Sequence, residues 1–429
     1  MSLYVYFETY GCSANQNNTE IMAGLVKQSG LEITNNEKIA DIIVINSCIV
    51  KGPTENKIKR RISDLQALKK PIIIAGCMPS VRVNQLSGLN IYLLDICHTL
   101  DIVKLIKDIQ QEQYSLENYV NKKPEVKLNK PKIPLKKKIG ITQISEGCLG
   151  NCSFCMTKYA KGQLYSYPEE DIIKNVSQDI KSGCKEIWLT SQDSAAYGLD
   201  KGKSRLPQLL TKILNIKGNF RLRLGMMNPN NVLPILKELI ELYKNDKMYK
   251  FLHIPLQSGS DKILKSMNRK YSSLDFINIT KEFKKEIPNI TLATDIIVAF
   301  PGETNEDFNS TKEVIKKVQP QIFNISRFWP MQGTLAYNYK QISPEIAKKR
   351  DLELHSLQKS IAKSNNQEML NKDIKVFISE YDKKTKEYLA RTESYQLVKI
   401  KSETDILGKT LICKIIKANS YSLSGEIKS

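Results

Sequence analysis

The sequence predicts an α/β protein in three parts: a doubly wound parallel sheet, a partial barrel of six strand–helix units, and a small antiparallel β domain. Short apolar segments alternate with helical periodicity over most of the chain, which favours parallel sheets. The last section instead carries closely spaced β-like segments with turns between them. A length of 429 residues also exceeds one average domain.

The first section, residues 1–115, reads as strands that alternate with helices. Each expected strand is a short apolar segment bounded by turn residues, and the spacers carry helical periodicity. Strands are predicted at Leu3–Phe7, Ile42–Ile45, Ile72–Ala75 and Ile91–Ile96, and helices at Asn17–Lys27 and Thr54–Leu68.

Three cysteines lie just beyond the first three of these strands: Cys12, Cys48 and Cys77. Ligands bind beyond the carboxyl ends of strands in open α/β sheets, so we expect these thiols to converge and hold a cluster. For any one of them, a small buried apolar role is the alternative. The remaining cysteines outside the motifs are interpreted as spare thiols: Cys97, which closes the fourth strand, Cys184 and Cys413.

Residues 116–138 are rich in lysine and proline. Prolines and like charges discourage regular structure, so the segment is predicted to be a basic linker. A linker of this kind can touch phosphate, although a purely solvated segment is the simpler interpretation.

From residue 139 to 366 the alternation of strands and helices returns, which predicts a partial barrel. Its strands are expected at Gly140–Ile144, Glu186–Thr190, Phe220–Leu224, Phe251–Leu256, Thr294–Phe300 and Ile322–Phe328. Function concentrates at the carboxyl ends of such strands. The polar candidates there are Gln192, Gln257, Ser258, Asp295 and Arg327. For each, an ordinary role in a turn or helix cap stays open.

The last section, residues 367–429, predicts a small antiparallel barrel or sandwich. Its β-like segments are Ile374–Ser379, Tyr388–Arg391, Tyr395–Ile400, Thr410–Ile416 and Ser420–Ser424. The lysines of this section and Arg391 are candidates for binding RNA, and a β domain without that role is the alternative.

The central section opens on a compact cysteine motif, Cys148-Leu-Gly-Asn-Cys152-Ser-Phe-Cys155. Four-iron clusters normally take one thiolate per iron, so three cysteines leave one iron open to a small molecule. Closed zinc sites use paired cysteines and four protein ligands, and no second pair or nearby histidine follows here. Zinc, or three incidental thiols, is the less favoured interpretation.

Composition points to a reduced compartment and an anionic partner. The net charge is +20, which favours nucleic acid, although the chain is rich in lysine throughout. Nine scattered cysteines do not form a disulfide framework. The N-terminus lacks a basic, cleavable leader, and no apolar segment has the length of a membrane span. We therefore expect a cytoplasmic protein without a membrane partner.

The spacing of Cys148, Cys152 and Cys155, with Glu146-Gly before it, resembles the signature of the radical S-adenosylmethionine (SAM) enzymes. The resemblance implies that the open iron binds SAM, and that one electron from the cluster releases a 5′-deoxyadenosyl radical. Gln192, Gln257, Ser258, Asp295 and Arg327 then become candidate SAM contacts.

From end to end, the chain resembles the methylthiotransferase family. The matching segments are Tyr10-Gly-Cys12 with Asn15, Asn46-Ser-Cys48, Gly76-Cys-Met-Pro79, the central cysteine motif, 253–261 and 295–304. Segment 50–55 is similar to the archaeal and eukaryotic branch that acts on N6-threonylcarbamoyladenosine in tRNA. The last section resembles the TRAM RNA-binding module. Where the family usually reads Arg-Pro-Gly-Thr, this chain has Met331-Gln332-Gly-Thr, so Arg327 is a candidate replacement for the missing arginine.

This resemblance implies two [4Fe-4S] clusters: a SAM-cleaving cluster on Cys148, Cys152 and Cys155, and a sulfur-carrying cluster on the N-terminal thiols. Radical chemistry suits the unactivated hydrogen on carbon 2 of adenine. The implied product is the 2-methylthio derivative of threonylcarbamoyladenosine beside the anticodon. Implied partners are the tRNA anticodon stem-loop and an electron donor of the flavodoxin or ferredoxin type. The sulfur donor is left open.

Three alternatives are retained from the sequence. Two are enzymes that methylthiolate isopentenyladenosine in tRNA or an aspartate of a ribosomal protein. The third is a non-catalytic RNA-binding protein with structural iron–sulfur clusters, which would be expected to have four protein ligands per cluster.

Overall fold

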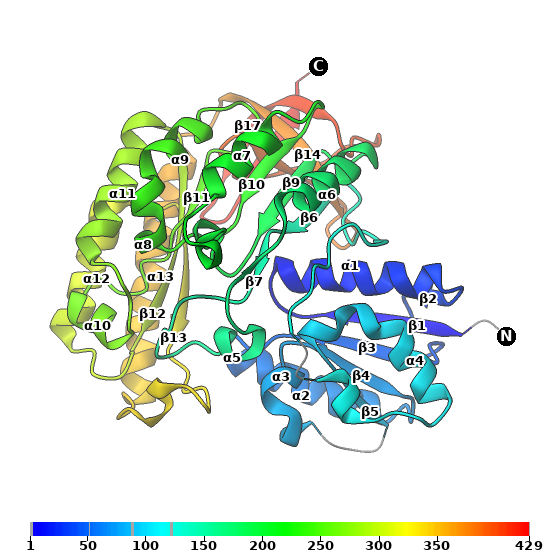
Figure 1. The fold of residues 1–429 in the computed structure, drawn as a ribbon. Coiled ribbons are helices and arrows are strands. Elements are labelled where there is room, and N and C mark those ends of the chain that lie inside the picture. Colours follow the sequence, from blue (N-terminus) through cyan, green and yellow to red (C-terminus); the bar gives the residue numbers. More distant parts are fainter. Residues whose placement is uncertain (1–2, 51, 87–89, 121–122, 429) are drawn as a thin grey trace.

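The computed structural model describes residues 3–50, 52–86, 90–120 and 123–428. Lys51, in the family-like segment 50–55, and residues 121–122 of the basic linker lie outside the described residues. Figure 1 shows three parts in chain order: an N-terminal sheet, a central curved sheet covered by helices, and a C-terminal β domain. No helix in the described ranges is long and apolar enough to cross a membrane.

The N-terminal sheet is parallel, with strand order β2-β1-β3-β4-β5. Two helices pack their apolar residues on one face and the others cover the opposite face, as a doubly wound sheet requires. The strands are β1 (Tyr4–Thr9), β2 (Glu32–Thr34), β3 (Ile42–Ser47), β4 (Ile72–Gly76) and β5 (Ile91–Asp95). The helices are α1 (Ser13–Gln28) and α4 (Ile102–Gln110) on one face, and α2 (Gly52–Gln66) and α3 (Pro79–Arg82) on the other.

The central part is a partial barrel of six parallel strands. The six strands form two three-stranded sheets, β10-β9-β6 and β11-β12-β13. Between β10 and β11 there is no continuous pairing, and an isolated parallel bridge pairs Leu222 of β10 with Met248, three residues before β11. The strands are β6 (Ile139–Gln143), β9 (Glu186–Thr190), β10 (Arg221–Leu224), β11 (Phe251–His253), β12 (Thr291–Val298) and β13 (Ile322–Arg327).

Amphipathic helices cover the outside of this barrel (Figure 1). They are α6 (Glu169–Lys181), α7 (Leu206–Leu214), α8 (Pro229–Val232), α9 (Leu236–Tyr243), α10 (Asp261–Ser266), α11 (Ser273–Glu286), α12 (Asn305–Val318) and α13 (Pro344–Gln367). A two-stranded antiparallel sheet, β7 (Ser145–Glu146) with β8 (Tyr165–Ser166), flanks the cysteine motif, and α5 (Thr157–Lys161) follows that motif.

The C-terminal part is a closed five-stranded barrel, in the order β14-β15-β16-β18-β17. All pairs are antiparallel except β16 with β18, which is parallel. A ring with an odd number of strands cannot alternate in direction all the way round, so one parallel pair is required. The strands are β14 (Asp373–Asp382), β15 (Glu387–Thr392), β16 (Leu397–Ile400), β17 (Thr410–Ala418) and β18 (Leu423–Ile427).

Tyr395 joins this barrel to the central one. Its ring packs 4.8 Å from the ring of Tyr249 and 5.1 Å from that of Phe251, measured between centroids. Ile139, the first residue of β6, and Trp188, in the middle of β9, belong to the same buried cluster. The C-terminal barrel therefore closes the end of the central barrel that lies opposite the strand carboxyl ends.

The segment predicted to be a basic linker, 116–138, begins with a short 3-10 helix, Leu116–Tyr119, because a single turn needs little helical propensity. Residues 123–138 contain no helix or strand, but they are not simply solvated. Lys127 is completely buried, and its Nζ lies 2.7 and 2.8 Å from the two carboxylate oxygens of Glu146. Ile133 donates its backbone N–H to the Glu20 carbonyl of α1. The segment therefore packs between the N-terminal and central parts instead of linking them loosely.

Candidate functional site

The three N-terminal cysteines lie at the carboxyl edge of the parallel sheet. Cys12 precedes α1, Cys48 follows β3 and Cys77 follows β4. β1 and β3 are neighbours at the point where the strand order reverses, which is where open α/β sheets bind ligands. At Gly11, with a φ of 111°, an added Cβ would lie 2.8 Å from Cys48 Cβ and 3.0 Å from its Sγ. Glycine thus lets the Cys12 loop approach Cys48 closely.

Asn15 and Asn46 tie these strand ends together. The Cys12 thiol donates to Asn15 Oδ1 at 3.2 Å, and Asn15 Nδ2 donates to the Ser47 carbonyl at 2.8 Å. Asn46 Nδ2 in turn donates to the Asn15 carbonyl at 2.8 Å. These two asparagines therefore link the Cys12 loop to the end of β3, and Asn15 orients the Cys12 thiol.

Burial makes the thiols of Cys48 and Cys77 hard to ionise without a cation. Burial raises the pKa of Cys48, and it raises the pKa of Cys77 to about 12. Negative charge on neighbouring cysteines raises both pKa values further, whereas the Lys161 ammonium lowers both. Iron binding requires thiolates, so a positive charge beside this site favours the ligating form.

The central cysteines lie in the loop between β7 and α5. The Gly150 N–H donates to Cys148 Sγ at 3.2 Å, and the Thr157 N–H donates to Cys155 Sγ at 3.4 Å. An added Cβ at Gly150 would lie 3.3 Å from Cys148 Sγ and 3.7 Å from Cys152 Sγ. The loop therefore wraps its backbone around the sulfurs, as a cluster-binding loop does.

Arg269 is a cation beside these sulfurs that the sequence did not reveal. Its Nη1 donates to Cys152 Sγ at 3.1 Å, and its charge lowers the pKa of Cys155, which burial raises. Burial also raises the pKa of Cys148, to about 12. Arg269 comes from the turn after α10, far from the motif in sequence, and no spacing pattern links the two.

The donor sets of both sites fit four-iron clusters. Within the described ranges, no three His, Cys, Asp or Glu side chains are arranged to hold one metal ion. A four-iron cluster makes a different demand, because each thiolate binds its own iron. In both sites the three thiols act on one another electrostatically, and a cation, Lys161 or Arg269, acts on them as well. Cys48 and Cys77 are buried, the three central cysteines are half-buried, and Cys12 is exposed.

The five predicted SAM contacts divide into two kinds. Gln192 and Gln257 follow β9 and β11, and both have a buried side-chain oxygen that finds no hydrogen-bond partner among the residues the structure describes. Gln257 also has a φ of 63°, a left-handed conformation that costs energy outside glycine. Unsatisfied buried acceptors of this kind are available to a ligand.

The other three candidates already have protein partners. Ser258 is buried, and its Oγ accepts the Ser260 N–H at 3.2 Å. Asp295 Oδ2 lies 2.8 Å from His253 Nε2. The Arg327 side chain is 54% exposed and lies 3.8 Å from an Asp351 carboxylate oxygen.

Met331 and Gln332, where the chain departs from the family pattern, pack against the N-terminal part. Met331 is buried with its core, and the Gln332 carbonyl accepts a hydrogen bond from Arg82 Nη1 at 3.2 Å. In the same segment, the Ala336 N–H donates to the Ser153 carbonyl of the central cysteine motif at 2.8 Å. This segment therefore connects the surroundings of the two cysteine sites.

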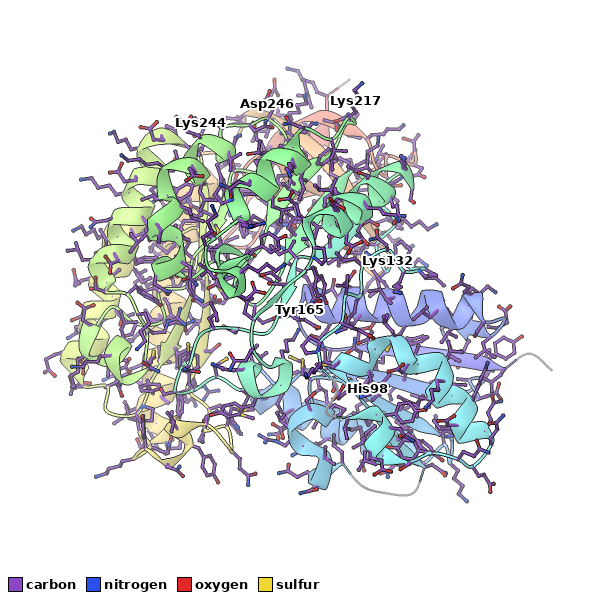
Figure 2. All side chains as sticks on the ribbon, in the orientation of Figure 1. His98, Lys132, Tyr165, Lys217, Lys244 and Asp246 are labelled. Atoms are coloured by element: carbon purple, nitrogen blue, oxygen red, sulfur yellow. The ribbon has the colours of Figure 1, made fainter. Side chains whose placement is uncertain are left out.

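α5 connects the two sites directly. The helix begins two residues after Cys155 and packs on α3, just beyond Cys77. Its last residue, Lys161, is buried, and its ammonium acts electrostatically on the N-terminal cysteines. Figure 2 shows side chains filling the junction between the two parts, with His98 on the N-terminal side and Tyr165 on the central side.

Family models match both parts of this arrangement. Residues 4–93 match the uncharacterized protein family UPF0004, and residues 142–315 match the radical SAM superfamily. Solved structures of similar fold include the radical S-adenosylmethionine methyltransferase TsrM of Kitasatospora setae, at 13% identity and a TM-score of 0.54, covering 76% of this chain and 73% of that one. The cobalamin-dependent S-adenosylmethionine radical enzyme OxsB has a TM-score of 0.51 at 12% identity, covering 90% of this chain and 64% of that one. The protein is therefore a radical SAM protein with an additional N-terminal cysteine domain.

Relatives of high similarity specify the family. A probable threonylcarbamoyladenosine tRNA methylthiotransferase of Pyrococcus abyssi is 40% identical, with 99% of both chains covered. Its counterpart in Methanocaldococcus jannaschii is 39% identical over 100% of this chain and 97% of the relative. The human threonylcarbamoyladenosine tRNA methylthiotransferase is 34% identical over 98% of this chain and 73% of the relative. This chain belongs to the threonylcarbamoyladenosine tRNA methylthiotransferase family.

Proposed function

We propose that this protein is a radical SAM enzyme that converts N6-threonylcarbamoyladenosine beside the tRNA anticodon to its 2-methylthio derivative. The observation that carries the proposal is the pair of three-cysteine sites, which α5 connects across the junction of the N-terminal and central parts. Full-length similarity to threonylcarbamoyladenosine tRNA methylthiotransferases supports the substrate. One open iron per site suits an enzyme better than a structural protein.

Each site has a separate role in this proposal. Cys148, Cys152 and Cys155 hold the cluster that binds SAM, and Cys12, Cys48 and Cys77 hold the cluster that carries the sulfur. When bound, these groups supply reductive SAM cleavage and the transferred sulfur. Gln192 and Gln257 offer SAM side-chain oxygens that have no hydrogen-bond partner among the described residues. Ser258, Asp295 and Arg327 are the other three proposed SAM contacts.

tRNA is the macromolecular partner, and the charge of +20 supports this. We assign RNA binding to a TRAM-like domain at 367–429, following an N-terminal domain at 1–115, a basic segment at 116–138 and a radical SAM domain at 139–366. Lys414 and Lys417 of β17 are exposed, so they can reach phosphate. An electron donor of the flavodoxin or ferredoxin type and a cytoplasmic location complete the proposal.

The decisive test of the two roles is separate loading of the sites. After anaerobic reconstitution, the wild type should bind two four-iron clusters. A Cys148→Ala/Cys152→Ala/Cys155→Ala variant should keep one cluster and lose SAM cleavage. Iron content equal to one cluster in the wild type, or SAM cleavage by that variant, contradicts the assignment.

The substrate is tested with defined tRNAs. Mass analysis of nucleosides should find the methylthio group on tRNA that carries threonylcarbamoyladenosine and none on tRNA with unmodified adenosine. Equal turnover of isopentenyladenosine tRNA would overturn the branch assignment. Peptide mass analysis of a ribosomal protein incubated with the enzyme and SAM tests the remaining enzyme alternative, and we expect no methylthio group on its aspartates.

A further inference from the structure

Lys161 is a buried lysine whose ammonium group lacks a partner. The residue is only 3% exposed, and its Nζ makes no hydrogen bond within the part of the chain that the structure describes. Burying an ammonium group without compensation costs several kcal/mol. A lysine at this position is therefore explained best by an anion that the polypeptide itself does not supply.

The fold holds Lys161 firmly against the N-terminal cysteines. Met156 and Ala160, on the same short helix, are buried in the N-terminal core together with Cys77. α5 also packs on α3 and on the turn Ile96–Asp101. The helix that follows the SAM-type cysteine motif thus delivers its last side chain to the other cysteine site.

The charges around Lys161 do not balance. Its ammonium acts electrostatically on the thiols of Cys77, Cys12 and Cys48, and on the Glu146 carboxylate. That carboxylate already accepts hydrogen bonds from Lys127 at 2.7 and 2.8 Å. Two buried ammonium groups thus share one buried carboxylate, which leaves a positive charge facing three sulfurs.

The missing anion follows from the chemistry of the proposed cluster. A four-iron cluster on three thiolates has one iron open to an outside ligand. A transferable sulfur on that iron is sulfide or a methanethiolate, and each is an anion that accepts hydrogen bonds. Charge-assisted hydrogen bonds in a buried site are stronger than those between neutral groups.

We propose that the Lys161 ammonium donates a hydrogen bond to the anionic sulfur ligand carried at the Cys12, Cys48 and Cys77 site. The inference rests on the proposed function and adds a positioning residue, contributed by the radical SAM domain, to the N-terminal site. Lys161 then holds the sulfur for transfer and stabilises the more negative, reduced state of this cluster.

The test measures sulfur binding instead of turnover. In the background that lacks Cys148, Cys152 and Cys155, the remaining cluster is titrated with sodium sulfide and followed by electron paramagnetic resonance. Lys161→Met should weaken sulfide binding on the order of tenfold or more and shift the reduction potential to a more negative value. Lys161→Arg should restore part of the sulfide affinity and part of the reduction potential, because arginine returns the positive charge and a hydrogen-bond donor.

Lys158→Met is the matched control. It removes the same charge from the same helix, but the Lys158 ammonium donates to Asn151 instead of facing the N-terminal thiols. Its sulfide affinity and potential should equal those of the background. Repeating the titration with all six cysteines present checks that the alanine substitutions have not moved α5.

Two results overturn the inference in distinguishable ways. Wild-type sulfide affinity and an unchanged potential in a cluster-loaded Lys161→Met variant reject the role of Lys161 alone. Failure of the background variant to bind any iron rejects the N-terminal site assignment, and the inference with it.

Discussion

Lys127 and Glu146 form a fully buried ion pair between the basic segment and the strand before the central cysteine motif. The lysine Nζ also donates to the Ile96 carbonyl at 2.7 Å. The Lys127 and Lys161 charges lower the pKa of Glu146, against the raising effect of its complete burial. The pair therefore joins three segments near the cysteine sites: the basic segment with Lys127, the turn at Ile96 and strand β7 with Glu146.

Lys127→Met should destabilise the protein strongly, because it leaves the Glu146 carboxylate buried without its main partner. We expect a loss of about 3–5 kcal/mol in the free energy of unfolding, measured by chemical denaturation. Lys130 is an exposed lysine of the same segment, and Lys130→Met should change the free energy of unfolding by less than about 0.5 kcal/mol. Equal effects would show that the pair contributes little.

The main outline of the fold was predictable because apolar strands and amphipathic helices alternate locally. β2 has only three residues, two of them polar, and the β7–β8 pair has two residues per strand, so neither carries a readable pattern. The burial of Lys127 was not predictable, because a lysine among prolines looks solvated until its carboxylate partner is placed beside it.

Tyr395→Ala should destabilise the protein by about 3 kcal/mol, because the ring fills the closed end of the central barrel. Tyr421→Ala, at a residue of the C-terminal barrel that is 69% exposed, is the control and should be nearly neutral. The denaturation midpoints of the two variants measure both effects.

Removal of residues 367–429 would expose the same apolar cluster. Loss of SAM cleavage after this truncation would therefore not by itself indicate a catalytic role for the C-terminal barrel.

Glu20 should make stability depend on pH. Burial raises the pKa of this carboxyl to about 7, although the Leu135 N–H, which donates to it at 3.0 Å, lowers the pKa. A pKa raised in the folded state gives stability that is complete below about pH 4.5 and is lost as pH rises through 7. Wild type should therefore lose about 2–3 kcal/mol relative to Glu20→Gln between pH 5 and 8.

The check is the free energy of unfolding of both proteins across that pH range. Glu112→Gln, at an exposed residue, provides the background pH dependence. A difference between wild type and Glu20→Gln that does not change with pH would show that Glu20 is already ionised in the folded protein.

The sequence was most informative about the position of site residues where the pattern is local. Three closely spaced cysteines identify their loop directly, and strand ends bring together Cys12, Cys48 and Cys77 at one sheet edge. Arg269 and Lys161 were missed, because each reaches its sulfurs only through the packing of distant elements. Ser258 stays a predicted SAM contact, and its hydroxyl also accepts the Ser260 N–H within its own loop, which the sequence did not indicate.

Trp329 should contribute to RNA binding by stacking on an unpaired base. Its indole is 47% exposed and lies over Gly52, where an added Cβ would overlap the ring. It lies two residues before the segment 331–336 that connects the two cysteine sites, and single-stranded bases stack readily on aromatic rings. Trp329→Ala should weaken binding of a tRNA anticodon stem-loop by about 1–3 kcal/mol, whereas Trp329→Phe should largely retain it.

Salt dependence separates this stacking from phosphate contacts. Trp329→Ala removes no cation, so the slope of log affinity against log salt should match the wild type, whereas Lys414→Ala/Lys417→Ala should reduce that slope. Tyr4→Ala, which removes an exposed aromatic at the opposite end of the N-terminal sheet, is the control and should bind the stem-loop normally.

Fluorescence of Trp329 tests the stacking directly. The chain has two tryptophans, and Trp188 is buried, so a Trp188→Phe variant reports Trp329 alone. Stacking requires quenching by the stem-loop, and unchanged emission at saturating RNA would place Trp329 outside the RNA interface.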